Sequence, residues 1–104
     1  LEDEADLSKV HFSMRLFDVY SRGFIGAMKG VITPAEVDAL PLGSVMMTYE
    51  CGMRFLADYL SGDTYFKVAK PDHNLIRCRT QFRLVEEMLG SYDEMLAVVR
   101  KYAE

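Results

Sequence analysis

Apolar residues recur at helical spacing along most of the chain after residue 13. A first stripe predicts a helix that begins after Ser13, whose hydroxyl suits the N-cap position. A second stripe, from residue 42 to residue 60, predicts another helix because its spacings are 4, 3, 4, 3 and 4. A third stripe, with alternating spacings of 3 and 4, predicts a last helix that runs toward Tyr102. In order, the three stripes consist of Leu16, Tyr20, Phe24, Ala27 and Val31; Leu42, Met46, Tyr49, Met53, Leu56 and Leu60; and Leu75, Cys78, Phe82, Val85, Leu89, Tyr92, Leu96 and Val99.

Residues with special backbone preferences predict where the second helical region begins. Thr33 and Glu36 have the spacing of a capping box, and Pro34 occupies the first helical position, where proline is favoured. Proline disrupts the interior of a helix. We therefore expect a short helix to stop at Pro41 and a separate helix to start at about Leu42.

Glycine and proline residues also mark where the predicted elements of the second half of the chain begin and end. Gly62 has the character of the residue that follows a helix end, where a left-handed backbone is common. A short extended segment is expected at 64–68, and Pro71 with Asp72 should open the last helix. Gly90–Ser91 is the place where that long helix is expected to bend.

These elements predict an all-α chain that forms a single helical subdomain over 1–104. An acidic, loosely ordered lead is expected at 1–12 and a helical body at 13–104, with an antiparallel hairpin of the third and last helices as its spine. The last helix would be about 40 Å long at 1.5 Å per residue. It must therefore lie along other helices, protrude, or pair with a second copy. Three glycines of the first helix are expected to allow close approach of another backbone: Gly23, Gly26 and Gly30.

Composition and charge narrow the classes of partner. Half of the 104 residues are apolar and the net charge is −4, which argues against broad nucleic-acid binding. The segment 54–83 nevertheless holds six basic and three acidic residues, so an anionic ligand is expected there. Cys51 and Cys78 lack the spacing of a metal site, and we expect buried free thiols in a reducing, cytoplasmic location. No membrane-spanning run is visible, and we expect the methionines to fill the core.

Arg54 is the first candidate for a binding residue. Glu50, Arg54 and Asp58 stand at i, i+4 and i+8, a spacing that suits a surface ladder of ion pairs. The functional alternative is that the guanidinium donates a bidentate hydrogen bond to a ligand while its carboxylate neighbours hold it in place. The spacing leaves both interpretations open.

Four polar or aromatic residues follow within twenty positions of Arg54. Tyr65 is either a core aromatic or a group that meets a polar ligand with its ring or hydroxyl. Asp63 is typical of a turn residue that binds nearby backbone N–H groups. His73 and Asn74, at the start of the last helix, are more typical of capping groups than of ligands.

The chain lacks the motifs of a complete enzyme. It has no glycine-rich phosphate loop, no His-Gly-Asp and no Gly-x-Ser-x-Gly sequence, and its two histidines lie far apart. We therefore expect no catalytic residue, no metal ligand and no resident cofactor in this chain, and no catalysis by these residues alone. The first residue is Leu1, followed at once by acidic residues. We take this as a sign of a piece of a longer protein.

Several ordered motifs resemble a known family. They are "DLSKV", "ITPAEVDALPLG", "CGMRFLADYLSGDTYFKV" and "PDHNLIRCRTQFRLVEEM", and they cover residues from about 2 to 88. Together they resemble the C-terminal end of sugar kinases of the aminoglycoside-phosphotransferase-like family, and most closely the N-acetylhexosamine kinases. Proteins of this type have also carried a mucin-desulfating label. Sulfatase chemistry wants a metal site and an oxidised Cys or Ser, and nothing in this sequence supports it.

The resemblance implies a fold and a role for particular residues. Its members have a two-lobed, protein-kinase-like fold, and this chain would be the final helical subdomain on the sugar side of the cleft. ATP, magnesium and the catalytic loop would belong to the part upstream. Carried over by position, Arg54 and Tyr65 would contact the sugar, an N-acetylhexosamine phosphorylated at its anomeric hydroxyl. The chain has no Trp to stack on a sugar ring, which leaves the identity of the sugar open.

A second interpretation belongs to a different functional class. The chain could be a non-catalytic helical module that associates with itself through its long last helix. The two interpretations are compatible, because a subdomain separated from its enzyme exposes apolar surface that favours association. We therefore expect a homodimer of the isolated chain, with Leu89 and Tyr92 in its interface.

Overall fold

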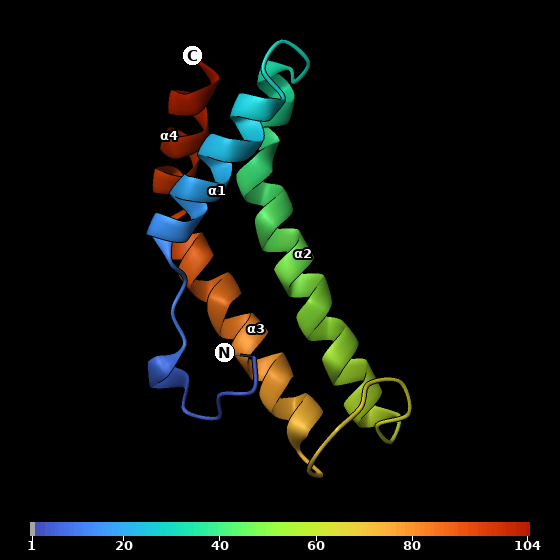
Figure 1. The fold of residues 1–104 in the computed structure, drawn as a ribbon. Helices are drawn as coiled ribbons and strands as arrows, with labels where there is room; N and C mark the ends of the chain where they lie inside the picture. Colours follow the sequence, from blue (N-terminus) through green and yellow to red (C-terminus); the bar gives the residue numbers. More distant parts are fainter. Residues whose placement is uncertain (1) are drawn as a thin grey trace.

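The computed structural model describes residues 2–104, which form four α-helices and one short 3-10 helix (Figure 1). The described residues include no β-strand, so the prediction of an all-α chain is confirmed. The elements are η1 (Leu7–Lys9), α1 (Met14–Ala27), α2 (Pro34–Leu60), α3 (His73–Gly90) and α4 (Tyr92–Ala103).

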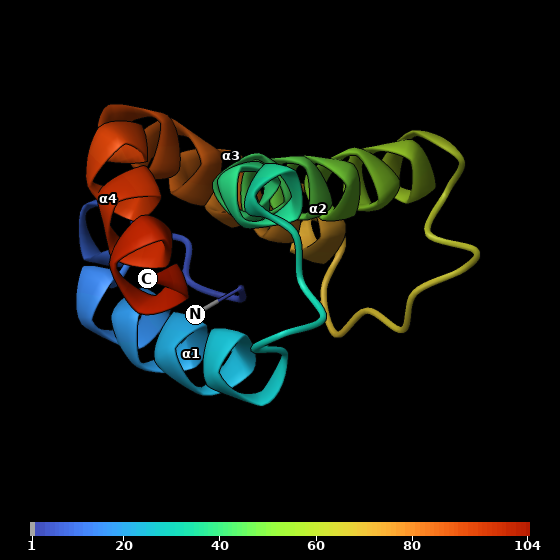
Figure 2. The ribbon, with the colours of Figure 1, turned by 90° about the horizontal axis from the view of Figure 1, so that it is seen from above.

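The helices α2 and α3 form the predicted hairpin. They run in opposite directions, pack along much of their length and are joined by the loop 61–72 at one end (Figure 1). At the other end, α1 and α4 pack against each other, and α4 also packs against α2 (Figure 2). The chain is elongated, with principal extents of 48 × 27 × 18 Å, because the hairpin extends well beyond the four-helix end.

The prediction that a helix ends at Pro41 is wrong, because α2 runs through this residue. Val37, Pro41 and Val45 are spaced by four residues and all are buried. Val37 packs with Ile25 and Val45 packs in a second cluster of the core. Burial of this continuous face offsets the hydrogen bond that the proline nitrogen cannot donate. The capping box at Thr33 is confirmed, with both of its hydrogen bonds formed.

Two of the predicted apolar stripes lie on the surface. In α1, Leu16 and Tyr20 are exposed, and Ser21 and Ile25 are buried in their place. The stripe of α2 from Leu42 to Leu60 is likewise exposed at most of its positions. Its buried face is the neighbouring one, formed by Val37, Pro41, Val45, Gly52, Phe55 and Asp58. Apolar residues surround most of α2, so its spacing could not show which side meets the other helices.

The close approach of two helices occurs at a glycine that was not predicted. No atom lies within 4 Å of a Cβ built on any of the three glycines expected to serve this purpose, Gly23, Gly26 and Gly30. A Cβ at Gly52 would instead lie 2.6 Å from Cε1 of Phe82. At Gly52, therefore, the side chains of α3 pack directly against the backbone of α2.

The expected long last helix is two helices. α3 ends at Gly90 and α4 begins at Tyr92, which confirms the bend predicted at Gly90–Ser91. The Ser91 N–H donates to the carbonyls of Glu87 and Met88, and its own carbonyl accepts from Met95. The bend lets Met88 and Met95 enter one core cluster from two helices.

The acidic lead at the N-terminus lies against α3 over the residues that are described. The Glu2 carbonyl accepts a hydrogen bond from the Thr80 hydroxyl at 3.0 Å. The Phe12 N–H donates to the Glu87 carboxylate at 3.0 Å. Between these two points, Val10 is fully buried. Residue 1 lies outside the described residues.

The sulfur-containing residues divide between core and surface. Cys51 and Cys78 are both free, and only Cys78 is buried, so the expectation of two buried thiols holds for one of them. Met88 and Met95 fill the core as expected, whereas three methionines of α2 are exposed: Met46, Met47 and Met53.

Candidate functional site

The residues that link the C-terminal end of α2 to the next loop converge on Asp58. This carboxylate is 6% exposed. Its Oδ1 accepts hydrogen bonds from the Tyr65 N–H at 2.7 Å and from the Thr64 hydroxyl at 3.5 Å. Its Oδ2 accepts from the Phe66 N–H at 3.0 Å and from Asn74 Nδ2 at 2.7 Å. Asp58 therefore fixes the backbone of the residue that the sequence suggested as a ligand contact.

The turn after α2 has the geometry that Gly62 predicted. Gly62 has a φ of +93° and Asp63 a φ of +60°, so the chain turns through two left-handed residues. The Asp63 N–H donates to the Asp58 carbonyl at 2.8 Å and the Gly62 N–H to the Tyr59 carbonyl at 3.3 Å. These two bonds form a Schellman motif, which reverses the chain and brings the following residues back along α2.

Arg54 and Tyr65 lie side by side, as the functional interpretation requires. The guanidinium carbon of Arg54 lies 5.8 Å from the centroid of the Tyr65 ring and 5.7 Å from the centroid of the Phe66 ring. Both distances fall within the range of a cation–π contact. Phe66 in turn packs against Phe55 with ring centroids 4.7 Å apart, which attaches the loop to the core.

The alternative of a surface ion-pair ladder is wrong for this helix. Among residues 2–104, the ion pairs include neither Arg54 nor Glu50. Asp58, which the ladder required as a partner of Arg54, is turned inward to the loop and to Asn74. The Arg54 guanidinium is exposed and its charge remains available to a ligand.

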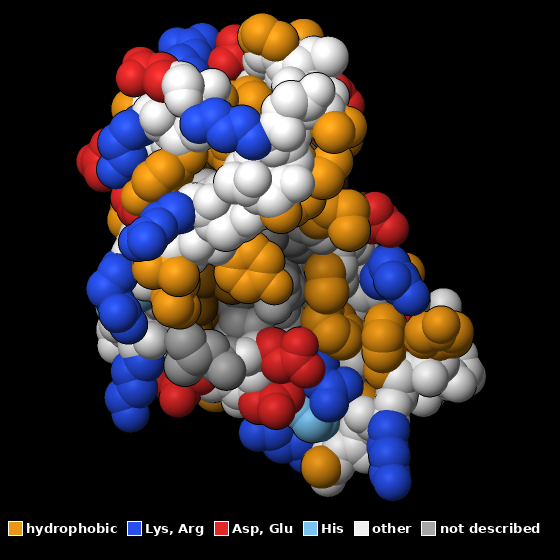
Figure 3. Space-filling model, turned by 45° about the horizontal axis from the view of Figure 1, so that its top comes forward, with side chains coloured by type: hydrophobic (Ala, Val, Ile, Leu, Met, Phe, Trp, Pro, Cys, Tyr) orange, Lys and Arg blue, Asp and Glu red, His pale blue; other side chains and the backbone are white. Residues whose placement is uncertain are grey.

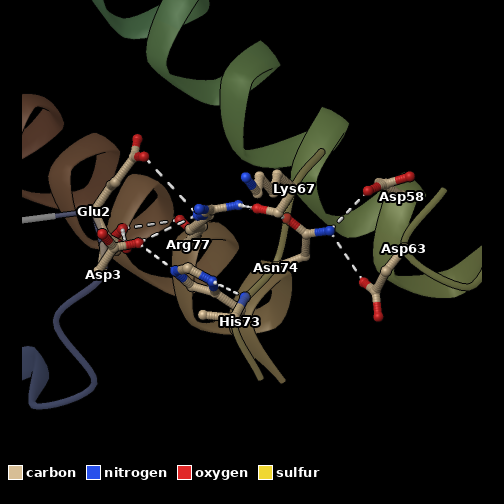
Figure 4. Close-up of polar contacts among 10 residues, drawn as sticks. Glu2, Asp3, Asp58, Asp63, Lys67, His73, Asn74 and Arg77 are labelled. Carbon is tan, nitrogen blue, oxygen red and sulfur yellow. Dashed lines mark hydrogen bonds and ion pairs between the residues drawn. The ribbon is translucent and has the colours of Figure 1, made fainter. Parts of the chain in front are cut away.

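Asn74 and His73 connect this loop to α3 rather than capping it, as Figure 4 shows. Asn74 is fully buried, and its Nδ2 donates to Asp58 and also to Asp63 Oδ1 at 3.0 Å. The expectation that Asp63 binds backbone N–H groups is therefore replaced by a bond to a side chain. His73 Nδ1 accepts from the Ala69 N–H at 3.1 Å, so its Nε2 carries the proton and donates to Asp3 at 2.5 Å.

Arg77 extends the same network to the N-terminal lead. Its Nη1 donates to the Lys67 carbonyl at 3.0 Å and to Asn74 Oδ1 at 3.3 Å, while its Nε donates to Asp3 at 3.2 Å (Figure 4). The guanidinium also lies 5.6 Å from the centroid of the Phe55 ring. Hydrogen bonds from His73 and Arg77 lower the pKa of the Asp3 carboxyl. One polar network therefore joins the lead, the loop and the end of α2.

The electrostatics of Asp58 reflect a contest between burial and hydrogen bonding. Burial alone raises the pKa of this carboxyl, because it disfavours the charged form. The hydrogen bonds from the Phe66 and Tyr65 N–H groups and from Asn74 act in the opposite direction and prevail, so the pKa lies below its ordinary value. The carboxylate is therefore ionised at neutral pH and accepts hydrogen bonds from its four donors.

Arg54, Asp58 and Tyr65 border a shallow hollow of about 410 Å³, a volume in the range of small-molecule sites. Its lining includes the cation of Arg54, two aromatic rings and the hydroxyl-bearing residues Ser61 and Thr64. Such a surface can bind a ring with polar edges and an apolar face. The lining residues are Arg54, Ala57, Asp58, Ser61, Thr64, Tyr65 and Phe66.

A second hollow, of about 290 Å³, lies where the ends of α1 and α4 meet the start of α2. Its polar side chains are already engaged with one another. Arg100 pairs with Asp38 at 2.9 Å, and Lys29 donates to the Glu104 carbonyl at 2.8 Å. The hollow beside Arg54 is the better candidate because its cation forms no ion pair with a carboxylate of residues 2–104.

Arg54 and Tyr65, which the resemblance assigns to one site, do lie side by side. The roles of Asp58, Phe66 and Arg77 were not predicted. A signal for Asp58 was present. An acidic residue in the last turn of a helix faces the negative end of the helix dipole, which is unfavourable unless donors compensate. Asp58 stands two residues before the last residue of α2 and is held by such donors.

No group of three His, Cys, Asp or Glu side chains in residues 2–104 is placed to hold a metal ion. None of the described helices combines the length and the apolarity needed to cross a membrane. No known family profile matches the chain.

Proposed function

We propose that these residues form the substrate-side helical subdomain of an ATP-dependent sugar kinase that phosphorylates an N-acetylhexosamine at its anomeric hydroxyl. The observation that carries the proposal is the meeting of Arg54 and Tyr65, which are eleven residues apart in the sequence and lie at one hollow. The resemblance of the sequence motifs to N-acetylhexosamine kinases supplies the substrate class and the reaction.

In this role the two side chains bind and orient the sugar. The Tyr65 ring offers a face for the apolar side of the pyranose, and Arg54 donates hydrogen bonds to an acetamido carbonyl or a ring hydroxyl. Holding the sugar in one orientation presents its anomeric oxygen to the phosphoryl donor. The resemblance assigns the phosphoryl donor and its magnesium to a part of the enzyme upstream of these residues, so no chemical step is assigned to this chain.

The exposed apolar faces support a role within a larger enzyme. A helix that is apolar on nearly all sides is normally buried on all sides. The stripe of α2 includes Leu42, Met46 and Leu60, which are exposed by 49%, 61% and 75%. Hydrophobic side chains also gather across the middle of the face shown in Figure 3, while charged side chains lie along its left side and in its upper and lower parts. A neighbouring lobe would cover such surface.

The experiment that tests this function uses the natural chain that contains these residues. ATP-dependent phosphate transfer is measured on a panel of N-acetylhexosamines, with Arg54→Ala beside the unaltered protein. Loss of a hydrogen bond from a charged group costs about 1.5–3 kcal/mol, so kcat/KM should fall roughly 10- to 150-fold.

Arg79→Ala is the matched control, because Arg79 is exposed on α3 and belongs to no ion pair among the described residues. Its activity should remain unchanged. A folded natural chain that phosphorylates none of the sugars would refute the proposed function. Activity that survives Arg54→Ala in full would refute the assignment of Arg54.

The exposed stripe of α2 also favours a second candidate, a module that associates with itself. The face has six apolar positions at coiled-coil spacing and no charge among them. A stable interface buries about 800 Å² on each partner, which is the area that this face and its surroundings would have to cover. If this candidate is correct, Met46→Glu should convert a dimer to a monomer in light scattering after size-exclusion chromatography.

The sequence predicted a different dimer interface, on the last helix, that includes Leu89 and Tyr92. These two residues differ in their exposure to solvent. Leu89 is 58% exposed, whereas Tyr92 is half-buried and packs against the cluster of Val45, Met88 and Met95. Leu89→Glu is therefore the informative substitution, and Tyr92→Glu would disturb the core. A dimer mass that persists in both Leu89→Glu and Met46→Glu would exclude both interfaces.

A further inference from the structure

The loop that carries Tyr65 has few apolar anchors of its own. Thr64, Tyr65 and Lys67 are exposed, and Phe66 is the loop residue whose ring packs on the core ring of Phe55. Beyond Phe66, the Lys67 carbonyl accepts from Arg77 and the Ala69 N–H donates to His73, so this part of the loop is anchored on α3. At Tyr65 and Phe66 the backbone N–H groups bond to Asp58 instead, and these bonds hold the part of the loop that carries the Tyr65 ring.

Asp58 also sets the register between the two binding residues. It lies four residues after Arg54, one helical turn further along the same helix. Because its Oδ1 accepts the Tyr65 N–H at 2.7 Å, the ring of Tyr65 is held one turn away from the base of the arginine side chain. The bond fixes the backbone from which the Tyr65 ring extends, and the guanidinium of Arg54 lies 5.8 Å from the centroid of that ring.

Asn74 supports the carboxylate from the opposite side. It is fully buried and comes from α3, so its amide joins three segments. Nδ2 donates to both Asp58 and Asp63, and Oδ1 accepts from Arg77. The amide keeps the Asp58 and Asp63 carboxylates together despite their like charge, because each carboxylate accepts a hydrogen bond from the same NH2 group.

We propose that Asp58 and Asn74 act as positioning residues for sugar binding, which hold Tyr65 against Arg54. The effect on catalysis rests on the proposed function, whereas the effect on the loop does not. The hairpin of α2 and α3 has other contacts to maintain it, including Phe82 against Gly52 and Arg77 over the Phe55 ring. Loss of the Asp58–Asn74 pair should therefore release the loop without separating the helices.

Asn74→Asp tests the pair with the smallest change of shape. It replaces the donating amide by a carboxylate that faces Asp58 and Asp63, so both hydrogen bonds are lost and like charges meet. Amide hydrogen exchange at Tyr65 and Phe66, followed by NMR, reports on the bonds to Asp58 directly. Because a hydrogen bond to a charged group contributes about 1.5–3 kcal/mol, exchange there should accelerate roughly 10- to 150-fold. Asp58→Asn should give the same result.

Tyr102→Phe is the control for general destabilisation. It removes the hydrogen bond from the Tyr102 hydroxyl to Asp18, at the opposite end of the molecule. In this variant the midpoint of thermal unfolding should fall, but the exchange rates at Tyr65 and Phe66 should not rise beyond what this loss of global stability explains. The same comparison of Tm and exchange rate is then made for Asn74→Asp. Unchanged exchange at Tyr65 and Phe66 in Asn74→Asp would overturn the proposal.

Kinetics on the natural chain test the link to the sugar. Asn74→Asp should raise KM for the sugar at least about tenfold and leave KM for ATP unchanged, because a displaced Tyr65 weakens sugar binding. A merely structural role would lower the amount of active enzyme and leave both KM values as they were. If Arg54→Ala impairs transfer but Asn74→Asp leaves the sugar KM unchanged, the positioning proposal fails and the proposed function stands. If the folded natural chain phosphorylates none of the sugars, the proposed function fails, and amide exchange alone decides the role of the pair.

Discussion

The contact between α2 and α3 at Gly52 can be tested by a pair of identical substitutions. Gly43 and Gly52 both lie inside α2. A Cβ at Gly43 would meet no atom within 4 Å, whereas a Cβ at Gly52 would lie 2.6 Å and 2.8 Å from two carbons of the Phe82 ring and 3.2 Å from Gln81 Cβ. Gly43→Ala therefore reports the helix propensity alone, and Gly52→Ala reports the same propensity together with overpacking.

The magnitudes follow from these two terms. Replacing glycine by alanine in a helix interior stabilises it by about 1 kcal/mol, which is the whole effect expected for Gly43→Ala. Overpacking costs about 1–3 kcal/mol, so Gly52→Ala should range from neutral to about 2 kcal/mol destabilising. The ring of Phe82 would have to leave its stack on Tyr49, where the centroids are 5.5 Å apart.

Thermal unfolding followed by circular dichroism measures the difference. For a domain of this size each kcal/mol corresponds to about 4–8 °C in Tm, so Gly43→Ala should melt above Gly52→Ala by at least about 4 °C. Phe82→Leu in the Gly52→Ala background should recover part of the loss, because the smaller side chain vacates the space of the new methyl group. Equal stabilisation by the two alanines would show that α2 and α3 do not approach each other at Gly52.

Two further predictions concern the core and the response to acid. Met95→Ala should lower the free energy of unfolding in urea by about 2–5 kcal/mol, because Met95 is fully buried, whereas Met47→Ala at an exposed position should change it by less than about 0.5 kcal/mol; similar losses in both would contradict the placement of the core. The hydrogen bond from the Phe12 N–H is the main cause that lowers the pKa of Glu87, and the pKa of Asp58 is lowered as well. In acid, the unfolded chain therefore binds more protons than the folded chain. The stability from these groups is therefore present above their unfolded pKa values of 4.5 and 3.8, and it is lost as the pH falls through the lower folded values. Glu87→Gln should flatten the plot of unfolding free energy against pH below about pH 4.5, and an unchanged slope would show that the Phe12–Glu87 contact does not form in solution.

The meeting of Arg54 and Tyr65 illustrates how far the sequence could predict the site. Gly62 marks the turn, and a helix of known length places Arg54 about two turns before it. What spacing could not show was the destination of the Asp58 side chain. A carboxylate at i+4 from an arginine suits an ion pair as well as it suits an inward hydrogen-bond acceptor, and only the path of the loop brings the donors that decide between them.

The apolar faces show the same limit more sharply. The periodicity of apolar residues identified the helical segments, and the residue types at Thr33 and Glu36 identified the capping box. The apolar stripes predicted to be buried in α1 and α2 nevertheless lie mostly on the surface. In α2 nearly every side of the helix is apolar, so the buried side is selected by the positions of α1, α3 and α4 and not by α2 itself. The prediction that a helix ends at Pro41 failed for a related reason. The free-energy cost of a proline inside an isolated helix can be estimated from the sequence, but the gain from packing its ring in a core cannot.

Local chemistry determined the helical class, the left-handed turn at Gly62 and the bend at Ser91. Each of these depends on neighbours within a few positions, where backbone sterics and short hydrogen bonds dominate. The tertiary structure alone decided which faces are buried, that Gly52 receives Phe82, and that Asp58 and Asn74 hold the loop. These outcomes depend on contacts between segments far apart in the sequence, and many pairings of apolar and polar groups are compatible with one helical pattern until the chain packs.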